Sequence, residues 1–483
     1  MLDATGKFSP RLIRTLAVMV LAASLCSCAS RPINDPIEQV DPNAGYRPQL
    51  LMENRDNNDP STFFVLSFSG GGTRAASLSY GVLEELHRYE ITVGGQQRRL
   101  TDEIDVITGV SGGSFTALAY ALYGDQLFQE YESRFLKRNV QGNLLKRSLA
   151  WPSNWFRMMS GKYGRSEVAA EYYDEILFEN ATFNDLVDKG GPIAIPTGTV
   201  LSTGARLAFF QNDFDLICSD IGTMKLSRAA ATSSAVPVAL SPVTLNNYGG
   251  NCDYEYPAWV RDAVMADPDT QPSARALQRY HEMQKLQDSA NHPYLHLVDG
   301  GVADNLGVRG VLEALEEIAF SGAFRKQHNF GGIRQVVLII VNAQSDNQNN
   351  WDMSEKPPNS IKQTLQSSGV PIARYTFDTV ELMKELVQDE QFQRQLNIAE
   401  ARLAGAGREE AEAMFPETRM LVFDISFDAI RDPEERQYFE NLPTSFVLED
   451  EQVDRLREVA SKLMRQSPDY REVISQIGAK RVE

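Results

Sequence analysis

Residues 62–74 of the chain read TFFVLSFSGGGTR, and residues 104–122 read IDVITGVSGGSFTALAYAL. In each stretch an apolar run of strand length is followed by a glycine-rich turn and then by a helical pattern. Strand, turn and helix in this order are typical of βαβ units, which build parallel sheets. These two stretches therefore favour an α/β fold.

The same alternation continues along the chain. Strands are predicted at 62–68, 104–107, 193–198, 295–298, 336–341 and 420–426, and helices at 74–89, 115–122 and 450–464. Strands that alternate with helices indicate a largely parallel central sheet that is covered by helices on both faces.

Charge narrows the range of partners. The 483 residues include 47 Lys and Arg against 65 Asp and Glu, which gives a formal net charge of −18. Nucleic-acid binding needs a basic surface, so no nucleic-acid partner is expected. Bulk charge also gives no attraction to an anionic membrane, and a protein that acts on lipid would need another attachment.

The N-terminus predicts such an attachment. Basic residues precede an apolar run from Leu16 to Leu25, which is shorter than the ~20 residues of a membrane-spanning helix. We therefore expect residues 1–27 to be a signal peptide. The run ends in a sequence that resembles a bacterial lipobox, with Cys28 as the lipidated residue. Ala29 resembles the pattern sorted to the outer membrane, so an exported, lipid-anchored envelope protein is expected; a plain signal peptide is the alternative.

The remaining chain divides by composition. We expect a lipidated N-terminus and polar tether at 28–60, a catalytic domain at 61–345 with a surface insertion at 253–293, and a C-terminal α/β extension at 346–483 that packs on the catalytic domain. An exported compartment permits a disulfide between Cys218 and Cys252, although two buried, reduced thiols would fit the sequence equally well.

Ser111 is the candidate nucleophile. It lies in Gly109-Val-Ser-Gly-Gly113, between a predicted strand and an apolar helix, where a nucleophile elbow is found. The turn is tight, so glycines must flank it. The hydroxyl would project at the helix N-terminus, whose dipole and free N–H groups favour developing negative charge.

The first glycine run has a matching use. Gly70, Gly71 and Gly72 can turn backbone N–H groups inward, as the oxyanion of acyl transfer requires. A phosphate cradle is the competing interpretation. The P-loop form needs Gly-Lys-Ser/Thr after the glycines, whereas Thr73 and Arg74 stand there, and nucleotide binding would leave Ser111 unexplained.

Asp299, followed by Gly300 and Gly301, ends the predicted strand 295–298. Side chains alternate along a strand, so His296 points away from wherever Asp299 points. A Ser-Asp-His triad in hydrolase order would have to use His328, which lies in a polar stretch. The preferred arrangement is a Ser–Asp dyad, in which the carboxylate takes the hydroxyl proton.

These motifs, with Thr232-Ser-Ser-Ala-Val-Pro237 between the last two, resemble the patatin-like phospholipase family over residues 62–345. Residues 441–446, NLPTSF, resemble a C-terminal segment of its bacterial members. The resemblance implies a three-layer α/β/α domain, no metal or other cofactor, and phospholipid or lysophospholipid acyl esters as substrates. It implies these site residues: Ser111 as nucleophile, Asp299 as general base, and Gly70, Gly71, Gly72 and Arg74 around the oxyanion.

The sequence thus predicts a serine-dependent lipid acyl hydrolase. A catalytically silent envelope lipoprotein and an acyltransferase remain alternatives. No His, Cys, Asp or Glu cluster has metal-ligand spacing. Residues 149–163 hold two of the four tryptophans and several other large apolar side chains. They fit a packed loop, or a mouth that faces acyl chains.

Overall fold

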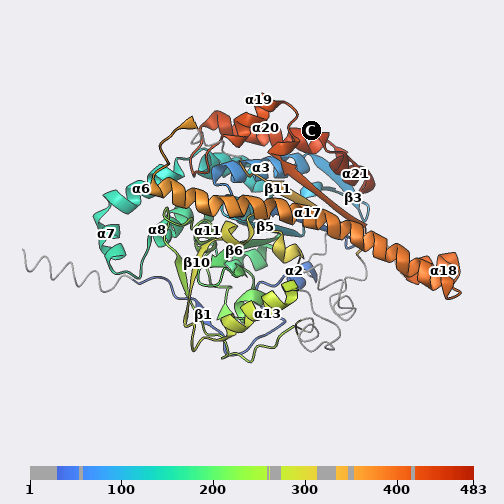
Figure 1. The fold of residues 1–483 in the computed structure, drawn as a ribbon, viewed down its shortest axis with the longest axis horizontal. Coiled ribbons are helices and arrows are strands. Elements are labelled where there is room, and N and C mark those ends of the chain that lie inside the picture. Colours follow the sequence, from blue (N-terminus) through green and yellow to red (C-terminus); the bar gives the residue numbers. More distant parts are fainter. Residues whose placement is uncertain are drawn as a thin grey trace, which may run out of the picture.

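The computed structural model describes residues 30–53, 58–257, 260, 274–312, 333–345, 353–414 and 419–482. Its centre is one mixed sheet (Figure 1). In spatial order the strands are β12 (Arg419–Ser426), β11 (Gln335–Asn342), β2 (Thr62–Phe68), β5 (Val106–Gly109), β6 (Ile193–Val200), β10 (Tyr294–Asp299) and β9 (Val243–Asn246), with β7 (Arg206–Ala208) paired to β6.

The sheet is mostly parallel. The pairs from β12 through β6 run parallel, whereas β10 is antiparallel to both β6 and β9. In register, Gly109 of β5 faces Pro196 of β6, and Asp299 of β10 faces Gly198 two residues farther along β6. The strand ends that carry the predicted nucleophile and base thus flank the same part of β6.

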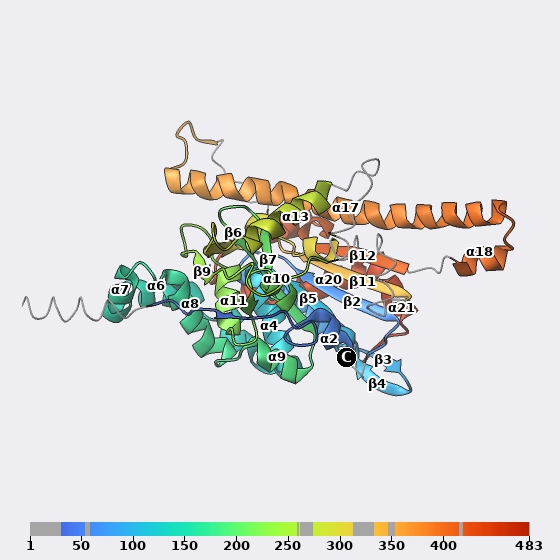
Figure 2. The same cartoon turned by 90° about the horizontal axis from the view of Figure 1, so that it is seen from below.

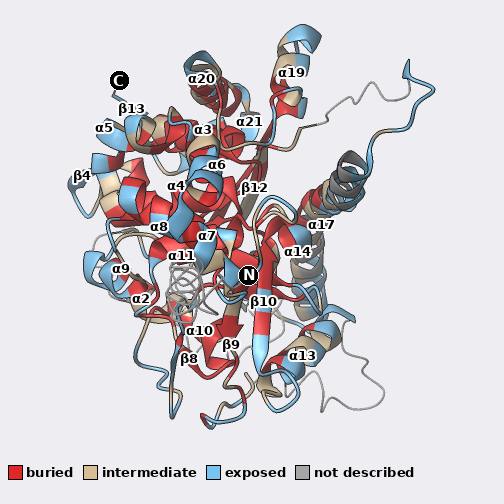
Figure 3. Cartoon of the chain, turned by 90° about the vertical axis from the view of Figure 1, so that its left-hand side faces the viewer, coloured by how far each residue is buried: buried red, intermediate tan, exposed pale blue. Residues whose placement is uncertain are grey.

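Helices cover both faces of the sheet, which confirms the three-layer α/β/α prediction. Helices α3 (Thr73–His87) and α4 (Gly112–Tyr123) lie on one side, and the long helix α17 (Ser360–Leu403) lies on the other (Figure 3). Every residue of α4 from Gly112 to Leu122 is buried, as its nearly uniform apolar sequence requires. Figure 3 shows the buried residues concentrated in the sheet and its inner helices.

The other elements surround this core. A small sheet contains β3 (Tyr89–Val93), β4 (Gln96–Arg99) and β13 (Lys480–Arg481). The other helices are α2 (Pro48–Glu53), α5 (Leu127–Tyr131), α6 (Val140–Ala150), α7 (Pro152–Met159), α8 (Arg165–Tyr173), α9 (Phe183–Lys189), α10 (Gln211–Asp215), α11 (Leu226–Ser233), α13 (Ala274–Gln287), α14 (Gly301–Asp304), α18 (Arg408–Met414), α19 (Pro433–Glu440), α20 (Asp450–Gln466) and α21 (Pro468–Gln476). Within the described ranges, none of the helices combines the length and apolarity needed to cross a membrane.

The segment expected to be a polar tether is docked on the domain where the structure describes it. Strand β1 (Asp35–Pro36) pairs with β8 (Ser219–Asp220). The buried Tyr46 hydroxyl hydrogen-bonds both backbone groups of Ala194, at 2.8 and 3.0 Å. A buried ion pair of 2.7 Å joins Arg47 to Asp215. Individual residues such as Tyr46 and Arg47 fix this segment to the domain. They are not spaced with a helix or strand period, so the sequence of the segment suggested a free linker. Cys28 and residues 1–27 lie outside the described residues.

A disulfide joins Cys218 to Cys252, with Cα atoms 5.6 Å apart. The N-terminal segment is bound to both of these residues, because the Ile37 N–H donates to the Cys218 carbonyl and the Val40 N–H to the Cys252 carbonyl. The disulfide therefore lies under the docked segment.

Residues 253–293 were expected to form a surface insertion, and part of the stretch lies outside the described residues. Helix α13 within it is anchored to the body. Met283 and Leu286 are buried, and the Arg279 guanidinium lies 2.7 Å from the Asp213 carboxylate.

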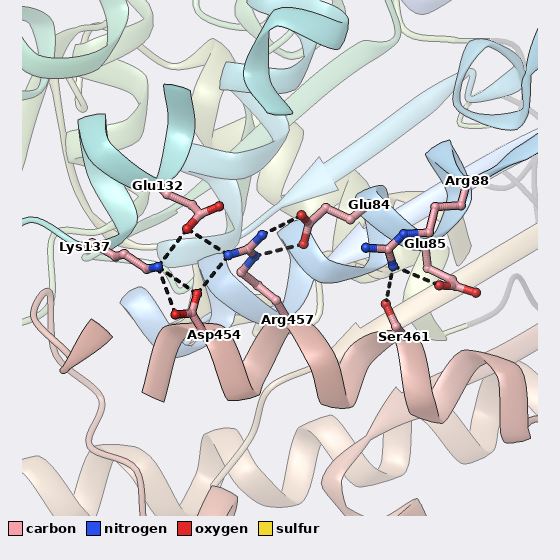
Figure 4. Close-up of polar contacts among 8 residues, drawn as sticks. All are labelled: Glu84, Glu85, Arg88, Glu132, Lys137, Asp454, Arg457 and Ser461. Carbon is pink, nitrogen blue, oxygen red and sulfur yellow. Dashed lines mark hydrogen bonds and ion pairs between the residues drawn. The ribbon is translucent and has the colours of Figure 1, made fainter. Parts of the chain in front are cut away.

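The C-terminal residues belong to the same core. Strand β12 extends the central sheet, and α20 packs along α3. In Figure 4, Arg457 of α20 binds Glu84 of α3 through two hydrogen bonds of 2.7 and 2.9 Å and also contacts Glu132. A Cβ atom at Gly81 would lie 2.6 Å from the Arg457 carbonyl oxygen, so glycine allows this close approach.

Candidate active site

Ser111 stands at a strained turn between β5 and α4. Its backbone angles, φ 49° and ψ −119°, are unusual for a residue with a side chain and are typical of a functional constraint. The turn fits because its glycines lack Cβ atoms. A Cβ atom at Gly113 would lie 2.6 Å from the Phe68 carbonyl oxygen, and one at Gly109 would lie 2.7 Å from the Ser114 Cα atom.

Asp299 lies at the end of β10 with a buried carboxyl group. The Gly301 N–H donates to its Oδ1 atom at 2.8 Å, and the Ser111 side chain lies near enough to the carboxylate to influence its pKa. Burial raises the pKa of Asp299 to about 6, although the Gly301 N–H and the Ser111 side chain both act to lower it. The carboxylate is therefore more basic than an exposed aspartate and still ionised at neutral pH.

One serine from α11 positions both partners. The Ser233 hydroxyl accepts the Ser111 N–H at 2.9 Å, and the Ser233 carbonyl accepts the Gly300 N–H at 3.2 Å. Two residues later, the Ala235 carbonyl accepts the Asp299 N–H at 3.0 Å. Sequence reasoning assigned Ser233 no role; its only signal was the small-residue segment 232–237 in the family resemblance.

The glycine loop passes beside Ser111. A Cβ atom at Gly70 would lie 3.5 Å from the Ser111 Cβ atom, and Gly71 and Gly72 have φ values of 145° and 63°. The Gly70 N–H donates to the Asn305 carbonyl at 2.9 Å. Gly70 therefore does not offer its N–H to an oxyanion, which differs from the sequence expectation.

Three other backbone N–H groups in the glycine loop and at the start of α4 have no acceptor among the described residues. Within the described residues, we find no acceptor for the N–H groups of Gly71, Gly72 or Gly112. Gly112 is the first residue of α4, and a Cβ atom on it would lie 2.0 Å from the Gly72 carbonyl oxygen. The helix N-terminus and the glycine loop thus meet, and both carry N–H groups for which the described residues supply no acceptor.

Arg74 supports the loop from the opposite direction. Its buried guanidinium donates to the carbonyls of Ala343 and Leu442 and, at 3.0 Å, to the Thr444 hydroxyl. Burial lowers the pKa of Arg74 to about 10. Because its donors are directed to Ala343 after β11 and to the C-terminal residues Leu442 and Thr444, Arg74 is a positioning residue in this structure and not the oxyanion donor expected from the sequence.

A C-terminal segment, Leu442–Ser445, completes this support. The Thr73 N–H donates to the Ser445 carbonyl at 2.8 Å, and a Cβ atom at Gly72 would lie 2.3 Å from the same oxygen. The next residue, Phe446, packs its ring 5.5 Å from the ring of Phe115 in α4. The segment therefore touches the glycine loop, and Phe446 directly after it touches α4.

The histidines do not complete a triad within the described residues. His296 is exposed and hydrogen-bonds Thr244 at 2.9 Å, on the face away from Asp299. His328 lies outside the described residues. No group of three or more His, Cys, Asp or Glu side chains in the described ranges is placed to hold a metal ion.

Gly300 is the remaining motif residue with a close contact. A Cβ atom on it would lie 2.4 Å from the Thr197 carbonyl oxygen of β6. Glycine at this position therefore lets the turn after Asp299 pack directly on the neighbouring strand.

Two bacterial phospholipases are similar to this chain in sequence. A cGAMP-activated phospholipase of Vibrio cholerae serotype O1 is 31% identical over 194 residues, covering 38% of this chain and 52% of the relative. One of Escherichia coli is 30% identical over 179 residues, covering 37% and 47%. The chain thus spans about half the length of the curated relatives it matches.

The structural comparison gives distant matches. Human GIVD cytosolic phospholipase A2 aligns with a TM-score of 0.43 at 12% identity, covering 93% of this chain and 68% of that chain. The patatin-like phospholipase family model matches residues 66–312, just over half of the chain, and this span contains Ser111, Asp299 and the glycine loop. The chain therefore belongs to the patatin-like phospholipase family.

Proposed function

We propose that the protein hydrolyses acyl esters of membrane phospholipids or lysophospholipids through a Ser111–Asp299 dyad. The observation that carries the proposal is the position of Ser111, at a strained turn on the N-terminus of α4, next to the buried Asp299 carboxylate whose pKa its side chain lowers. Family membership supports a lipid substrate.

The geometry supports a two-step reaction. Asp299 accepts the hydroxyl proton as Ser111 attacks the ester carbonyl, and the resulting oxyanion is stabilised by N–H groups of Gly71, Gly72 and Gly112. Asp299 then gives the proton to the departing alcohol, which leaves an acyl-enzyme on Ser111. In the second step Asp299 takes a proton from water as this water attacks the acyl carbonyl. Asp299 then gives the proton to the Ser111 oxygen as the acyl–serine bond breaks, which releases the fatty acid and restores the serine hydroxyl.

Substitution tests the dyad. Ser111→Ala and Asp299→Asn should each lower fatty-acid release from phospholipid by about 10⁴-fold or more, because residues that act as a unit fail together. Release is measured by mass spectrometry, and a covalent serine probe should label the parent protein but not Ser111→Ala. Ser79→Ala, which changes a buried serine of α3, is the matched control and should keep full activity.

His328→Ala separates the dyad from a triad. The dyad requires this variant to stay active, whereas a loss equal to that of Ser111→Ala would establish a triad in its place. Full activity in Ser111→Ala would refute the whole mechanism.

We further propose that the protein is exported and held at the outer membrane by lipid on Cys28. The lipobox-like sequence carries this proposal, and the Cys218–Cys252 disulfide supports an oxidising compartment. Cys28→Ser should move the protein from the membrane fraction to the soluble fraction while hydrolysis of a soluble ester persists. Complete retention in carbonate-washed membranes would contradict the anchor.

A further inference from the structure

Helices α6 and α7 expose an unusual number of large apolar side chains. Exposed fractions are 60% for Leu145, 64% for Leu149, 51% for Trp151, 60% for Trp155 and 73% for Met159. We call these five residues the α6–α7 surface. Exposed clusters of this kind mark interaction sites, because isolated soluble proteins rarely maintain them.

The orientation of α7 is the reverse of that in an ordinary surface helix. Its buried residue is polar: Asn154 donates a hydrogen bond to the Arg147 carbonyl at 3.1 Å. Trp155 and Met159, spaced four residues apart on one helical face, point to solvent. A helix that packs on its own protein buries its apolar face, so this face is directed at something outside the chain.

Flanking contacts hold the surface in place. The Arg147 guanidinium lies 5.2 Å from the Trp151 ring and 4.4 Å from the Tyr172 ring of α8. Arg157 of α7 forms an ion pair with Glu171 of α8. The two helices are therefore braced against α8, and the apolar side chains are presented on a fixed support.

Charge identifies the partner's chemistry. The chain has a net charge of −18, yet no acidic residue occurs between Glu132 and Glu167. Within that stretch Lys146, Lys162 and Arg165 are exposed, and in the described part of the chain they form no ion pair with a carboxylate. Apolar and Trp side chains beside exposed cations are complementary to the interface of an anionic bilayer.

The location of the α6–α7 surface in the molecule is consistent with a bilayer as its partner. Figures 1 and 2 both place α7 beside the beginning of the described chain. Pro32 and Asn34 line a cavity of about 330 Å³ together with Tyr163 and Glu167, which follow α7. The surface thus lies on the side from which the chain leads back to Cys28.

We propose that the α6–α7 surface docks on an anionic lipid bilayer, with Trp155 and Met159 in the interface and Lys146 and Lys162 against headgroup phosphates. This contact is separate from the proposed lipid on Cys28 and does not depend on the Ser–Asp chemistry. It would orient the catalytic domain on the membrane that holds its substrate.

Vesicle flotation tests the proposal in the full chain carrying Cys28→Ser, which removes the lipid attachment. The vesicles are phosphatidylcholine with or without phosphatidylglycerol. The parent should float with the anionic vesicles and bind the neutral ones more weakly. The double variant Trp155→Gln/Met159→Gln should bind at least about tenfold more weakly. Lys146→Gln/Lys162→Gln should lose about fivefold per lysine on anionic vesicles only.

Matched controls use apolar and basic residues elsewhere. Phe377→Gln/Leu403→Gln changes two exposed residues of α17, and Lys189→Gln/Lys356→Gln changes two exposed lysines; both should bind vesicles like the parent. All variants should turn over a soluble ester at the parental rate. This activity shows that each variant is folded, independently of how it binds the vesicles.

Four results would overturn the proposal. Vesicle binding could be absent in the parent, equal in all variants, or weakened as much by the α17 control. An oligomer that Trp155→Gln/Met159→Gln disrupts would show instead that a second copy of the chain covers this surface.

Discussion

Asp299 combines the catalytic task proposed for it with a buried position, and its protonation should set the pH dependence of the reaction. The dyad needs the carboxylate form, and burial places the pKa at about 6. We therefore expect kcat/KM for a soluble ester to rise with pH, reach half its maximum near pH 6 and level off above pH 7. A pH–rate profile of the parent protein measures this. A profile that stays flat from pH 4 to 8 would show that Asp299 is not the base.

The same carboxylate should lower the stability of the fold. Because its pKa is raised from 3.8, the favourable protonated form is fully present below about pH 4 and is lost as the pH rises through 6. About two pKa units correspond to about 3 kcal/mol. Asp299→Asn should thus unfold at higher denaturant concentration than the parent at pH 8, with the difference shrinking toward pH 4.

Asp185→Asn is the control for this measurement. Hydrogen bonds from Thr182 lower the Asp185 pKa, so the stabilising form is the charged one, which is lost as the pH falls. This variant should be less stable than the parent at pH 8, opposite in sign to Asp299→Asn. A loss of stability at pH 8 in both variants would contradict the account of Asp299.

At the scale of the elements, the contact between the glycine loop and residues 442–445 can be tested by a single substitution. Gly72→Ala would press a Cβ atom into the Ser445 carbonyl at a φ of 63°. Gly94→Ala has a similar φ of 56° but meets nothing within 4 Å, so it carries the backbone strain without the clash. We expect Gly72→Ala to lower kcat by at least about tenfold and Gly94→Ala to leave kcat unchanged. Equal activity of the two variants would show that the C-terminal segment does not position the loop.

Local pattern explains which elements were predictable. The apolar run 62–68 coincides with β2, and the strand predicted at 295–298 is extended by one residue at each end in β10. The antiparallel direction of β10 was not predictable, because direction depends on pairing with β6 and β9. The 44-residue helix α17 was missed, since its apolar periodicity is weak and Pro371 interrupts it.

The residues of the candidate site likewise fall into a group that the sequence predicts and a group that it does not. Ser111, Asp299 and the glycines follow strands directly, so short motifs are enough to find them. The supports come from distant segments: Ser233 from α11, Asn305 after α14, and Leu442–Ser445 near the C-terminus. No spacing in the sequence links these segments to the motifs, and only the folded sheet brings them together.

For the whole molecule, the disulfide should matter most for the N-terminal segment. Cys218 and Cys252 are 34 residues apart, a closed loop worth about 4 kcal/mol of unfolding free energy in the chain-entropy model. Cys218→Ala/Cys252→Ala should lose about that much in denaturant unfolding and should expose residues 34–47 to faster hydrogen exchange. Quantitative labelling of two free thiols in the unreduced, denatured parent would show that the bond is absent in the protein.

The docked N-terminal segment also limits how far the enzyme can travel from its proposed anchor. Arg31 is already hydrogen-bonded to Asn246 of β9, so only two residues, Ala29 and Ser30, separate the body from Cys28. The three Cα-to-Cα steps from Cys28 to Arg31 span at most about 10 Å, whereas a free linker through residue 60 would reach about 100 Å. Such an enzyme could not swing out to lipids across a wide area. Its supply of substrate would be set by two-dimensional diffusion of lipids to a nearly fixed point on the membrane.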